Sequence, residues 1–300
     1  MPFQPNNFLF LCSLCALTAC SSGGDDDVAQ PVNDEPTTIN QTPGPIAPTG
    51  AVTSYGSVTV ADEEGLVSDL IASFYTLDSG VSAAFMNEQF STQSGNCQVQ
   101  DDGVIDFEEI STVFVPDVPG IPKNSVDAGD SVILTSQDGG TFATLDRQPT
   151  AGLIFYDLSD TSMLANQVVP DDLTVDVTGG AEFPVISSTS VPVVDPLGQV
   201  DYGDVNSITV NSQFSWTPAS ETGSLLRIFT TTNGGFFLED GVTVTCLAPD
   251  TGSFSFPADI QAQLGEDFSG TTPIISRLAV SAVQLESTVF YVIRESFSSQ

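Results

Sequence analysis

Apolar and polar residues alternate in short runs along most of the chain from residue 51 onwards. Val, Ile, Thr and Phe dominate these runs, and their side chains suit a pleated sheet that is buried on one face. Turn-forming residues separate the runs, as in Asp138-Gly139-Gly140 and Asn233-Gly234-Gly235. The pattern predicts strands over residues 57–60, 111–115, 131–135, 153–156, 173–177, 207–216, 225–231, 242–246, 277–285 and 288–293.

No long helical pattern separates the predicted strands, which favours antiparallel pairing over βαβ units. The sequence therefore predicts an all-β fold of antiparallel β-sandwich lobes with an immunoglobulin-like architecture. One short helix is predicted over residues 257–264, where Gly265 marks its end. Residues 66–74 fit either a strand or a helix. The loop-like stretch around VVPDD predicts a boundary, with one β-rich lobe over residues 51–169 and a β-sandwich lobe over residues 170–300.

The N-terminal segment has a different pattern. Residues 8–17 read FLFLCSLCAL, and a helix of this length would extend about 15 Å, which is too short to cross a bilayer. The run ends in Leu17-Thr18-Ala19-Cys20, which resembles the lipobox of bacterial lipoprotein signals, although Met1–Asn7 lacks the usual Lys or Arg. The resemblance implies a signal peptide over residues 1–19, cleavage before Cys20, and acylation of Cys20.

The residues after Cys20 read as a tether. Residues 21–50 are rich in Gly, Pro, Asp, Thr and Asn, contain no Lys or Arg, and have too little apolar surface to offset the entropy of ordering. We therefore expect Cys20 and the rest of residues 20–50 to form a lipidated, disordered linker that holds a folded body away from a lipid surface. Ser21 resembles the residue found in lipoproteins sorted to the outer membrane, which implies anchoring there, with the periplasmic or cell-surface face left open.

Several motifs of the body also carry a resemblance. Ser125-Val126-Asp127-Ala128-Gly129, Val177-Thr178-Gly179-Gly180, Phe214-Ser215-Trp216, and Cys246 followed by the segment 252–258 occur in this order. The body resembles uncharacterised β-sandwich surface lipoproteins of Gram-negative bacteria. This resemblance implies a sandwich architecture and export. It carries over no activity and no functional residues.

The charge balance excludes several functions. The chain has 39 Asp and Glu against 5 Lys and Arg, a formal net charge of −34, and it has no His. Five cations cannot supply the basic surface that nucleic-acid binding or docking to anionic lipid requires. Without His there is no Ser-His-Asp triad, no Cys-His dyad and no imidazole metal ligand. We therefore expect no nucleic-acid partner.

Two cysteines lie in the expected mature body, Cys97 and Cys246. An exported domain sits in an oxidising environment, so these two residues could form a disulfide. Two separate buried thiols, or pairing with another chain, remain open because spacing by itself does not place two Cα atoms together.

An acidic segment, residues 98–109, is a candidate calcium site. Its second half resembles an EF-hand loop at Gly103, Ile105 and Glu109, but Gln98 and Gln100 stand where that loop needs acidic ligands. A calcium site of another type is the alternative, and a β-turn with solvated carboxylates is the plainer interpretation. The candidate ligands are Asp101, Asp102, Asp106 and Glu109. No other cofactor is expected.

Two hydrolytic chemistries need only carboxylates. Asp78-Ser79-Gly80 and Asp250-Thr251-Gly252 resemble the catalytic loops of pepsin-like aspartic proteases, but such triplets are also ordinary turns. Glycoside hydrolysis needs two carboxylates and is compatible with almost any acidic β-protein. The aromatic residues that could form a sugar platform, or equally a sandwich core, are Tyr202, Trp216, Phe229, Phe236 and Phe237.

These observations leave the biochemical function open. The leading interpretation is a non-enzymatic lipoprotein of the cell envelope, held to the membrane through Cys20, whose body has a binding or structural role with an unknown protein or glycan partner. The alternatives are a carboxylate-based hydrolase of envelope or environmental polymers and a calcium-dependent adhesion module.

The acidic excess generates one prediction. Repulsion among unscreened carboxylates destabilises a compact state, so the melting temperature should rise with NaCl between near zero and about 1 M. Thermal unfolding monitored by circular dichroism measures this dependence. A melting temperature independent of salt would contradict it.

Overall fold

A computed structural model of the chain describes residues 37–39, 50–82, 86, 96–100, 123–150, 153–158, 167–203, 208–220, 224–231, 242–266, 268–271 and 273–298. These residues are mostly β-strand with one short helix, which confirms the predicted all-β class. They belong to a single compact unit that spans residues 36–300. None of their helical segments is long and apolar enough to cross a membrane.

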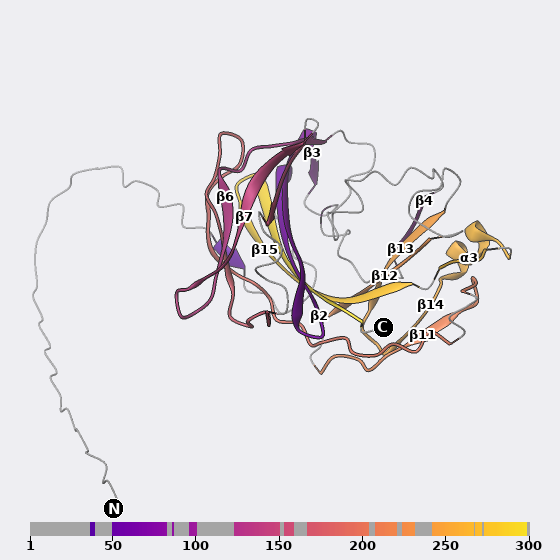
Figure 1. The fold of residues 1–300 in the computed structure, drawn as a ribbon. Helices are drawn as coiled ribbons and strands as arrows, with labels where there is room; N and C mark the ends of the chain where they lie inside the picture. The colour runs from indigo at the N-terminus through magenta and orange to yellow at the C-terminus, as the bar shows by residue number, and fades with distance from the viewer. Residues whose placement is uncertain are drawn as a thin grey trace, which may run out of the picture. The chain divides into compact units, whose positions relative to one another are not determined.

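Among the described residues, fourteen strands form one mixed sheet (Figure 1). Its main path runs β10 (Ile186–Ser190), β9 (Thr174–Val177), β6 (Ser131–Thr135), β7 (Thr141–Thr150), β8 (Leu153–Leu158), β3 (Leu66–Ser82), β2 (Ala51–Glu63), β16 (Thr288–Phe297), β15 (Ile274–Leu285), β12 (Leu225–Thr231), β13 (Thr243–Pro249) and β4 (Asn96–Gln100). Two further strands pair off this path, β1 (Thr37–Ile39) with β15 and β5 (Lys123–Ser125) with β3. A separate two-stranded sheet consists of β11 (Gln213–Ser215) and β14 (Ser253–Ser255), and α3 (Ala258–Leu264) follows it.

The centre of the sheet is a parallel pair in a sheet whose other described pairs are antiparallel. β2 lies beside β16 from Ser54 opposite Thr288 to Glu63 opposite Phe297. In Figure 1 the indigo β2 accordingly runs alongside the yellow C-terminal strands. Almost every residue of β16 is buried. Its residues 289–293 form the near-continuous apolar run that is typical of a strand buried on both faces, and polar residues follow at 294–296.

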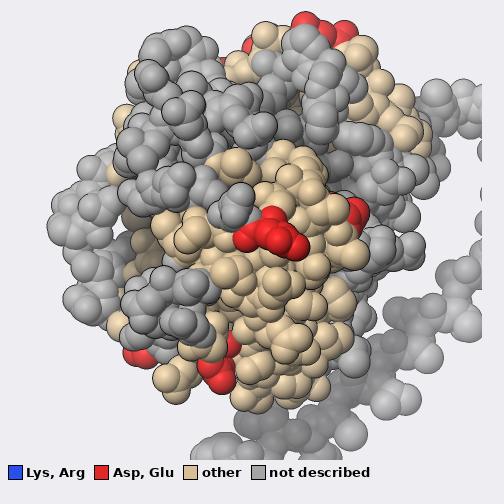
Figure 2. Space-filling view, turned by 90° about the vertical axis from the view of Figure 1, so that its right-hand side faces the viewer, with Lys and Arg blue, Asp and Glu red and all other residues tan. Residues whose placement is uncertain are grey.

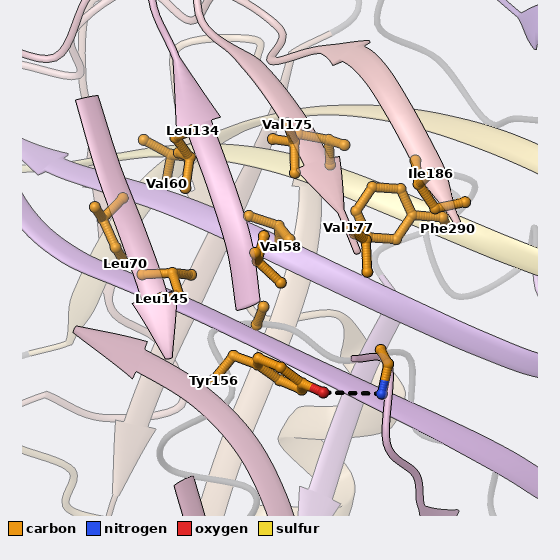
Figure 3. Packing of buried hydrophobic residues seen from close by; sticks show 14 of the residues in the cluster. Val58, Val60, Leu70, Leu134, Leu145, Tyr156, Val175, Val177, Ile186 and Phe290 are labelled. Atoms are coloured by element: carbon orange, nitrogen blue, oxygen red, sulfur yellow. Dashed lines mark hydrogen bonds between the residues drawn. The ribbon is translucent and has the colours of Figure 1, made fainter. Parts of the chain in front are cut away.

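Side chains on the two faces of β16 pack into two different cores, because successive side chains point to opposite faces of a strand. Phe290 and Val292 belong to the first core, which also contains the side chains from β2, β3 and β6 to β10 that are drawn in Figure 3. On the opposite face, β16 contributes Val289, Tyr291 and Ile293 to a second core. This core also contains side chains from β2, β3, β12 and β15.

A third core lies farther along the sheet. On β12, Leu226 and Ile228 enter this third core, whereas Leu225 enters the second. Phe214 of β11, Phe254 of β14 and residues of α3 close the third core from the other side. The second core therefore occupies one face of the long sheet, and the first and third cores occupy the other face at separate places.

The expected lobe boundary between residues 169 and 170 falls inside this continuous sheet. β9, from the expected second lobe, pairs with β6 of the expected first lobe. The first core likewise combines Val58 with Val175 and Phe290. Strands of the two expected lobes therefore share one sheet and one core.

Individual elements agree with the sequence except in one segment. The helix over residues 257–264 is confirmed by α3, and residues 66–74 are part of the strand β3. The expected strand over residues 207–216 is shorter, because residues 209–212 form a turn in which the N–H of Ser212 bonds the carbonyl of Thr209 (3.0 Å). The expected strand over residues 111–115 lies outside the described residues.

Two glycine-containing segments pack together at the edge of the first core, and a tyrosine bonds to one of them. The hydroxyl of Tyr156 accepts the N–H of Ala128 (2.8 Å), which Figure 3 shows, and donates to the carbonyl of Gly129 (2.8 Å). Gly129 has φ +104°, and a Cβ there would lie 2.3 Å from the Thr178 hydroxyl and 2.4 Å from the Gly179 carbonyl. Two of the motifs that carry the family resemblance are therefore parts of one packing contact.

This contact predicts a large cost for a methyl group at Gly129. Gly129→Ala and Gly139→Ala both place alanine at a positive φ, but nothing lies within 4 Å of a Cβ at Gly139. Each should lose about 1–2 kcal/mol of unfolding free energy from backbone strain. Gly129→Ala should lose at least about 2 kcal/mol more from overpacking. Urea unfolding of both variants measures the difference, and equal losses would contradict the packing argument.

Candidate functional site

Several of the predicted site residues lie outside the described part of the chain. They are the lipidation residue Cys20 and the calcium candidates Asp101, Asp102, Asp106 and Glu109. Phe236 and Phe237 of the suggested aromatic platform are also outside it. Within the described residues, no group of three or more Cys, Asp and Glu side chains could hold a metal ion.

The structure brings Cys97 and Cys246 together in a disulfide. Cys97 on β4 lies directly opposite Cys246 on β13, with the two Cα atoms 4.0 Å apart and the sulfur atoms 2.01 Å apart. Cys246 is fully buried in the third core. The bond fastens β4 to β13 and closes a loop with a sequence separation of 149, which chain-entropy arguments value at about 5 kcal/mol.

The two suspected protease aspartates have unrelated environments. Asp78 on β3 accepts a bond from the side chain of Asn124 (2.7 Å) at the surface. Asp250 follows β13 and is buried, with the Nε of Arg277 2.7 Å from its Oδ2. Further donors to Asp250 are the indole of Trp216, the N–H of Ala219 and the hydroxyl of Ser224. Asp250 is therefore part of a structural network, and none of the described residues bonded to its side chain carries a second carboxylate.

Arg277 extends this network to three loops. Its guanidinium also donates to the carbonyls of Asp195 (3.1 Å), Pro196 (2.8 Å) and Thr217 (2.6 Å). Its side chain is 2% exposed. A single buried cation on β15 thus positions the segments that carry residues 195–197 and 216–219.

Two further buried ion pairs lie at the end of the central parallel pair. Arg294 of β16 binds Asp62 of the neighbouring β2 (2.8 Å), and the next residue, Glu295, binds Arg227 of β12 (2.7 Å). Because neighbouring residues point to opposite faces of a strand, the two pairs lie on opposite sides of the sheet. Buried ion pairs of this kind add specificity more reliably than net stability.

Glu295 is the most strongly desolvated of these groups. Its side chain is fully buried, its Oε1 accepts bonds from Ser276 and Arg227, and its Oε2 and the Nε of Arg227 have no hydrogen-bond partner in the described structure. Burial raises the pKa of Glu295, and the charge of Arg227 opposes this effect without cancelling it. Burial also raises the pKa of Asp69, a neighbouring carboxyl that acts on Glu295 electrostatically.

All four arginines of the sequence are engaged with carboxylates. The fourth, Arg147, pairs with Asp127 at the surface. The remaining cation of the sequence is Lys123. Figure 2 shows one face of the molecule on which acidic side chains lie in small scattered groups and no Lys or Arg is visible among the described residues. The arginines therefore organise the interior and leave the acidic surface largely uncompensated.

Two adjoining hollows of about 540 and 590 Å³ lie beside β11 and β14, and we call them together the β11–β14 groove. Both are lined by Asp201, Tyr202, Gly203 and Ser215. The larger hollow continues over Gln213, Ser253 and Ser255, and the smaller one over Gln199 and Trp216. No sequence pattern predicts this groove, because serine and glutamine at the exposed positions of short strands are common.

The aromatic residues at the groove differ from the expected sugar platform. Trp216 is only 7% exposed, and its indole N–H is bound to Asp250 (2.7 Å). Tyr202 is half-buried, packs its ring 6.1 Å from that of Phe214, and bonds through its hydroxyl to Ser298 (2.9 Å). Tyr202 therefore lines both hollows with a ring that these contacts hold in place, and Trp216 is mainly part of the core beneath.

Comparison with known proteins adds no relative. No family model, no curated protein and no solved structure matches this chain. The arguments about function therefore rest on the residues and their geometry.

The raised pKa of Glu295 predicts a pH-dependent contribution to stability. The folded state holds its proton more tightly than the unfolded state, so the unfolding free energy should fall as pH rises above about 4.5 through the folded pKa. Glu295→Gln removes this titration. The wild-type advantage over the variant should therefore shrink with rising pH, as measured by urea unfolding from pH 2 to pH 8.

Asp138→Asn is the control with the opposite sign. Hydrogen bonds from Ser136 and Gly140 lower the pKa of the exposed Asp138, so its contribution is present above the ordinary Asp pKa and is lost as pH falls. A difference between wild type and Glu295→Gln that does not change with pH would contradict the assigned shift.

Proposed function

We propose that this chain is a lipoprotein of the bacterial cell envelope, anchored in the outer membrane through acylated Cys20, whose β-rich body binds a ligand outside the lipid. The observation that carries the anchor is the sequence Leu17-Thr18-Ala19-Cys20 behind a short apolar run. Acyl chains on one cysteine anchor a protein without a spanning helix, since each buried CH₂ contributes about 0.8 kcal/mol. The expected linker contains the short strand β1, which pairs with β15, and the body is described from residue 50 onwards.

The body supports binding better than catalysis. Its buried carboxylates Asp62, Asp250 and Glu295 are held in ion pairs with arginine. A glycosidase of the common kind needs two carboxylates about 5–9 Å apart that both face an open cleft. Among the described residues that line the β11–β14 groove, only Asp201 carries a carboxylate, and the reaction needs two. A hydrolase therefore remains the weaker proposal.

The calcium-dependent adhesion module stays a prediction of the sequence. Its candidate ligands at residues 101–109 lie outside the described residues, so no geometry speaks for or against it. The binding proposal does not depend on it.

The anchor is tested by replacing the acylated sulfur. Full-length protein with its signal is expressed in a Gram-negative host and labelled with radioactive palmitate. Wild type should take up the label and enter the detergent-soluble membrane fraction, whereas Cys20→Ser should remain unlabelled because it offers no thiol for acylation. Processing before residue 20 should fail in the same variant.

Cys15→Ser is the matched control, because it removes a neighbouring cysteine of the apolar run and leaves the lipobox intact. It should be labelled and processed like wild type. Labelling of Cys20→Ser at the wild-type level, or the absence of label from wild type, would refute the anchor.

A further inference from the structure

The exposed face of the β11–β14 pair is a neutral strip in a strongly acidic protein. Gln213 lies opposite Ser255, and Ser215 lies opposite Ser253, and all four side chains are exposed. Directly opposed residues on one face of an antiparallel pair have Cβ atoms about 5 Å apart. Three hydroxyls and one amide therefore form a compact array that carries no charge.

The array has unused hydrogen-bonding capacity. Each hydroxyl can donate one bond and accept two, and the amide of Gln213 has two donors and one acceptor oxygen. Within the described structure, none of these four side chains donates or accepts a hydrogen bond. They are open to a ligand that exchanges hydrogen bonds with both donors and acceptors.

The strip is held in place from below. Phe214 and Phe254, the residues between the exposed ones, are buried in the third core with their rings stacked 6.3 Å apart. The bridge between Asp201 and Ser215 joins β11 to the loop that carries Tyr202, through two backbone bonds of 2.8 and 3.0 Å. A rigid backing lets the polar groups bind without a large loss of conformational entropy.

The residues that line the groove determine which class of ligand it can bind. A net charge of −34 repels polyanions such as nucleic acids and acidic polysaccharides. A cation would need several converging carboxylates, and Asp201 is the carboxylate that the described lining offers. A lipid would need an apolar lining, whereas both hollows are mainly polar at their surface. A neutral ligand rich in hydroxyl groups fits all three constraints.

We propose that the β11–β14 groove binds a neutral glycan chain, with Gln213, Ser215, Ser253 and Ser255 bonding its hydroxyls and the ring of Tyr202 packing against a sugar ring. Each hollow has a volume in the range of small-molecule pockets, about 300–1,000 Å³, and the two share Asp201, Tyr202, Gly203 and Ser215 in their linings. An extended oligosaccharide therefore fits better than a single sugar. This inference rests on the binding role proposed above and names its ligand class.

The test uses the full-length protein in detergent on an array of hexasaccharides. The neutral members are built from glucose, mannose, xylose or N-acetylglucosamine, and the acidic members are oligogalacturonate and sulfated glucans. Binding to at least one neutral member and none of the acidic members is expected. Absence of neutral binding, or a preference for acidic members, would overturn the inference.

Two double variants locate the binding. Gln213→Ala with Ser215→Ala should weaken neutral binding at least about tenfold, because two hydrogen bonds to the ligand are lost. Ser187→Ala with Thr144→Ala removes two exposed strand hydroxyls on β10 and β7 and should bind like wild type. Matching melting temperatures show that each variant is folded. Equal affinities in wild type and the groove variant would overturn the placement of the ligand.

A second readout reports on the groove itself. Trp216 is the single tryptophan of the sequence and lines the smaller hollow, so titration with the bound neutral hexasaccharide should change the intrinsic fluorescence with the same affinity. Glycan binding without a fluorescence change and without loss in the groove variant would place the ligand elsewhere and leave the binding role intact. Palmitate labelling of Cys20 is independent of every one of these outcomes, so failure of the groove and failure of the anchor are distinguishable.

Discussion

The parallel contact between β2 and β16 is the constraint on which the rest of the structure depends. It joins strands that are 234 residues apart at matching positions and sends alternate side chains of β16 into two cores. Arg294 and Glu295 near its end point to opposite faces, where each meets a buried counter-charge. A slip of one residue would exchange their faces and break both ion pairs together with the apolar pattern. Almost every residue of β16 is buried, so apolar burial by itself distinguishes poorly between two registers of this strand. The buried charges therefore select the register.

The distribution of cations explains how a chain with so few of them folds and what it leaves at the surface. Three of the four arginines are buried beside carboxylates, at positions where one side chain joins several segments. Arg277 does so for the loops beside the β11–β14 groove. Little positive charge remains outside, so the surface field is acidic and favours ligands without negative charge. The strip on β11 and β14 differs from this acidic surface because its four exposed side chains carry no charge.

Local features of the fold could be predicted because neighbouring residues determine them. The strands around residues 131–135 and 225–231 follow from alternation, and α3 follows from its composition and Gly265. The turn at residues 209–212 was missed because Val210 continues the apolar alternation. Its backbone bond from Ser212 to Thr209 is supplemented by bonds to the hydroxyls of the same two residues. Trp216 and Asp250 suggested a sugar platform and a protease loop, yet they bind each other in a buried network. No local pattern distinguishes these uses, because the distinction depends on Arg277, which approaches from another strand.

The sequence by itself determined the β class, the acidic charge balance and the exclusion of His-based chemistry. It also generated the expectations of a lipid anchor at Cys20 and of no nucleic-acid partner. All of these depend on composition or on adjacent residues. Only the tertiary structure decided which strands are neighbours, that the sheet passes through both expected lobes, that Cys97 meets Cys246, and that four unremarkable polar residues form one strip. These features join residues far apart in the chain. The positions of these residues depend on how three cores pack against one sheet. That packing is a property of the whole chain.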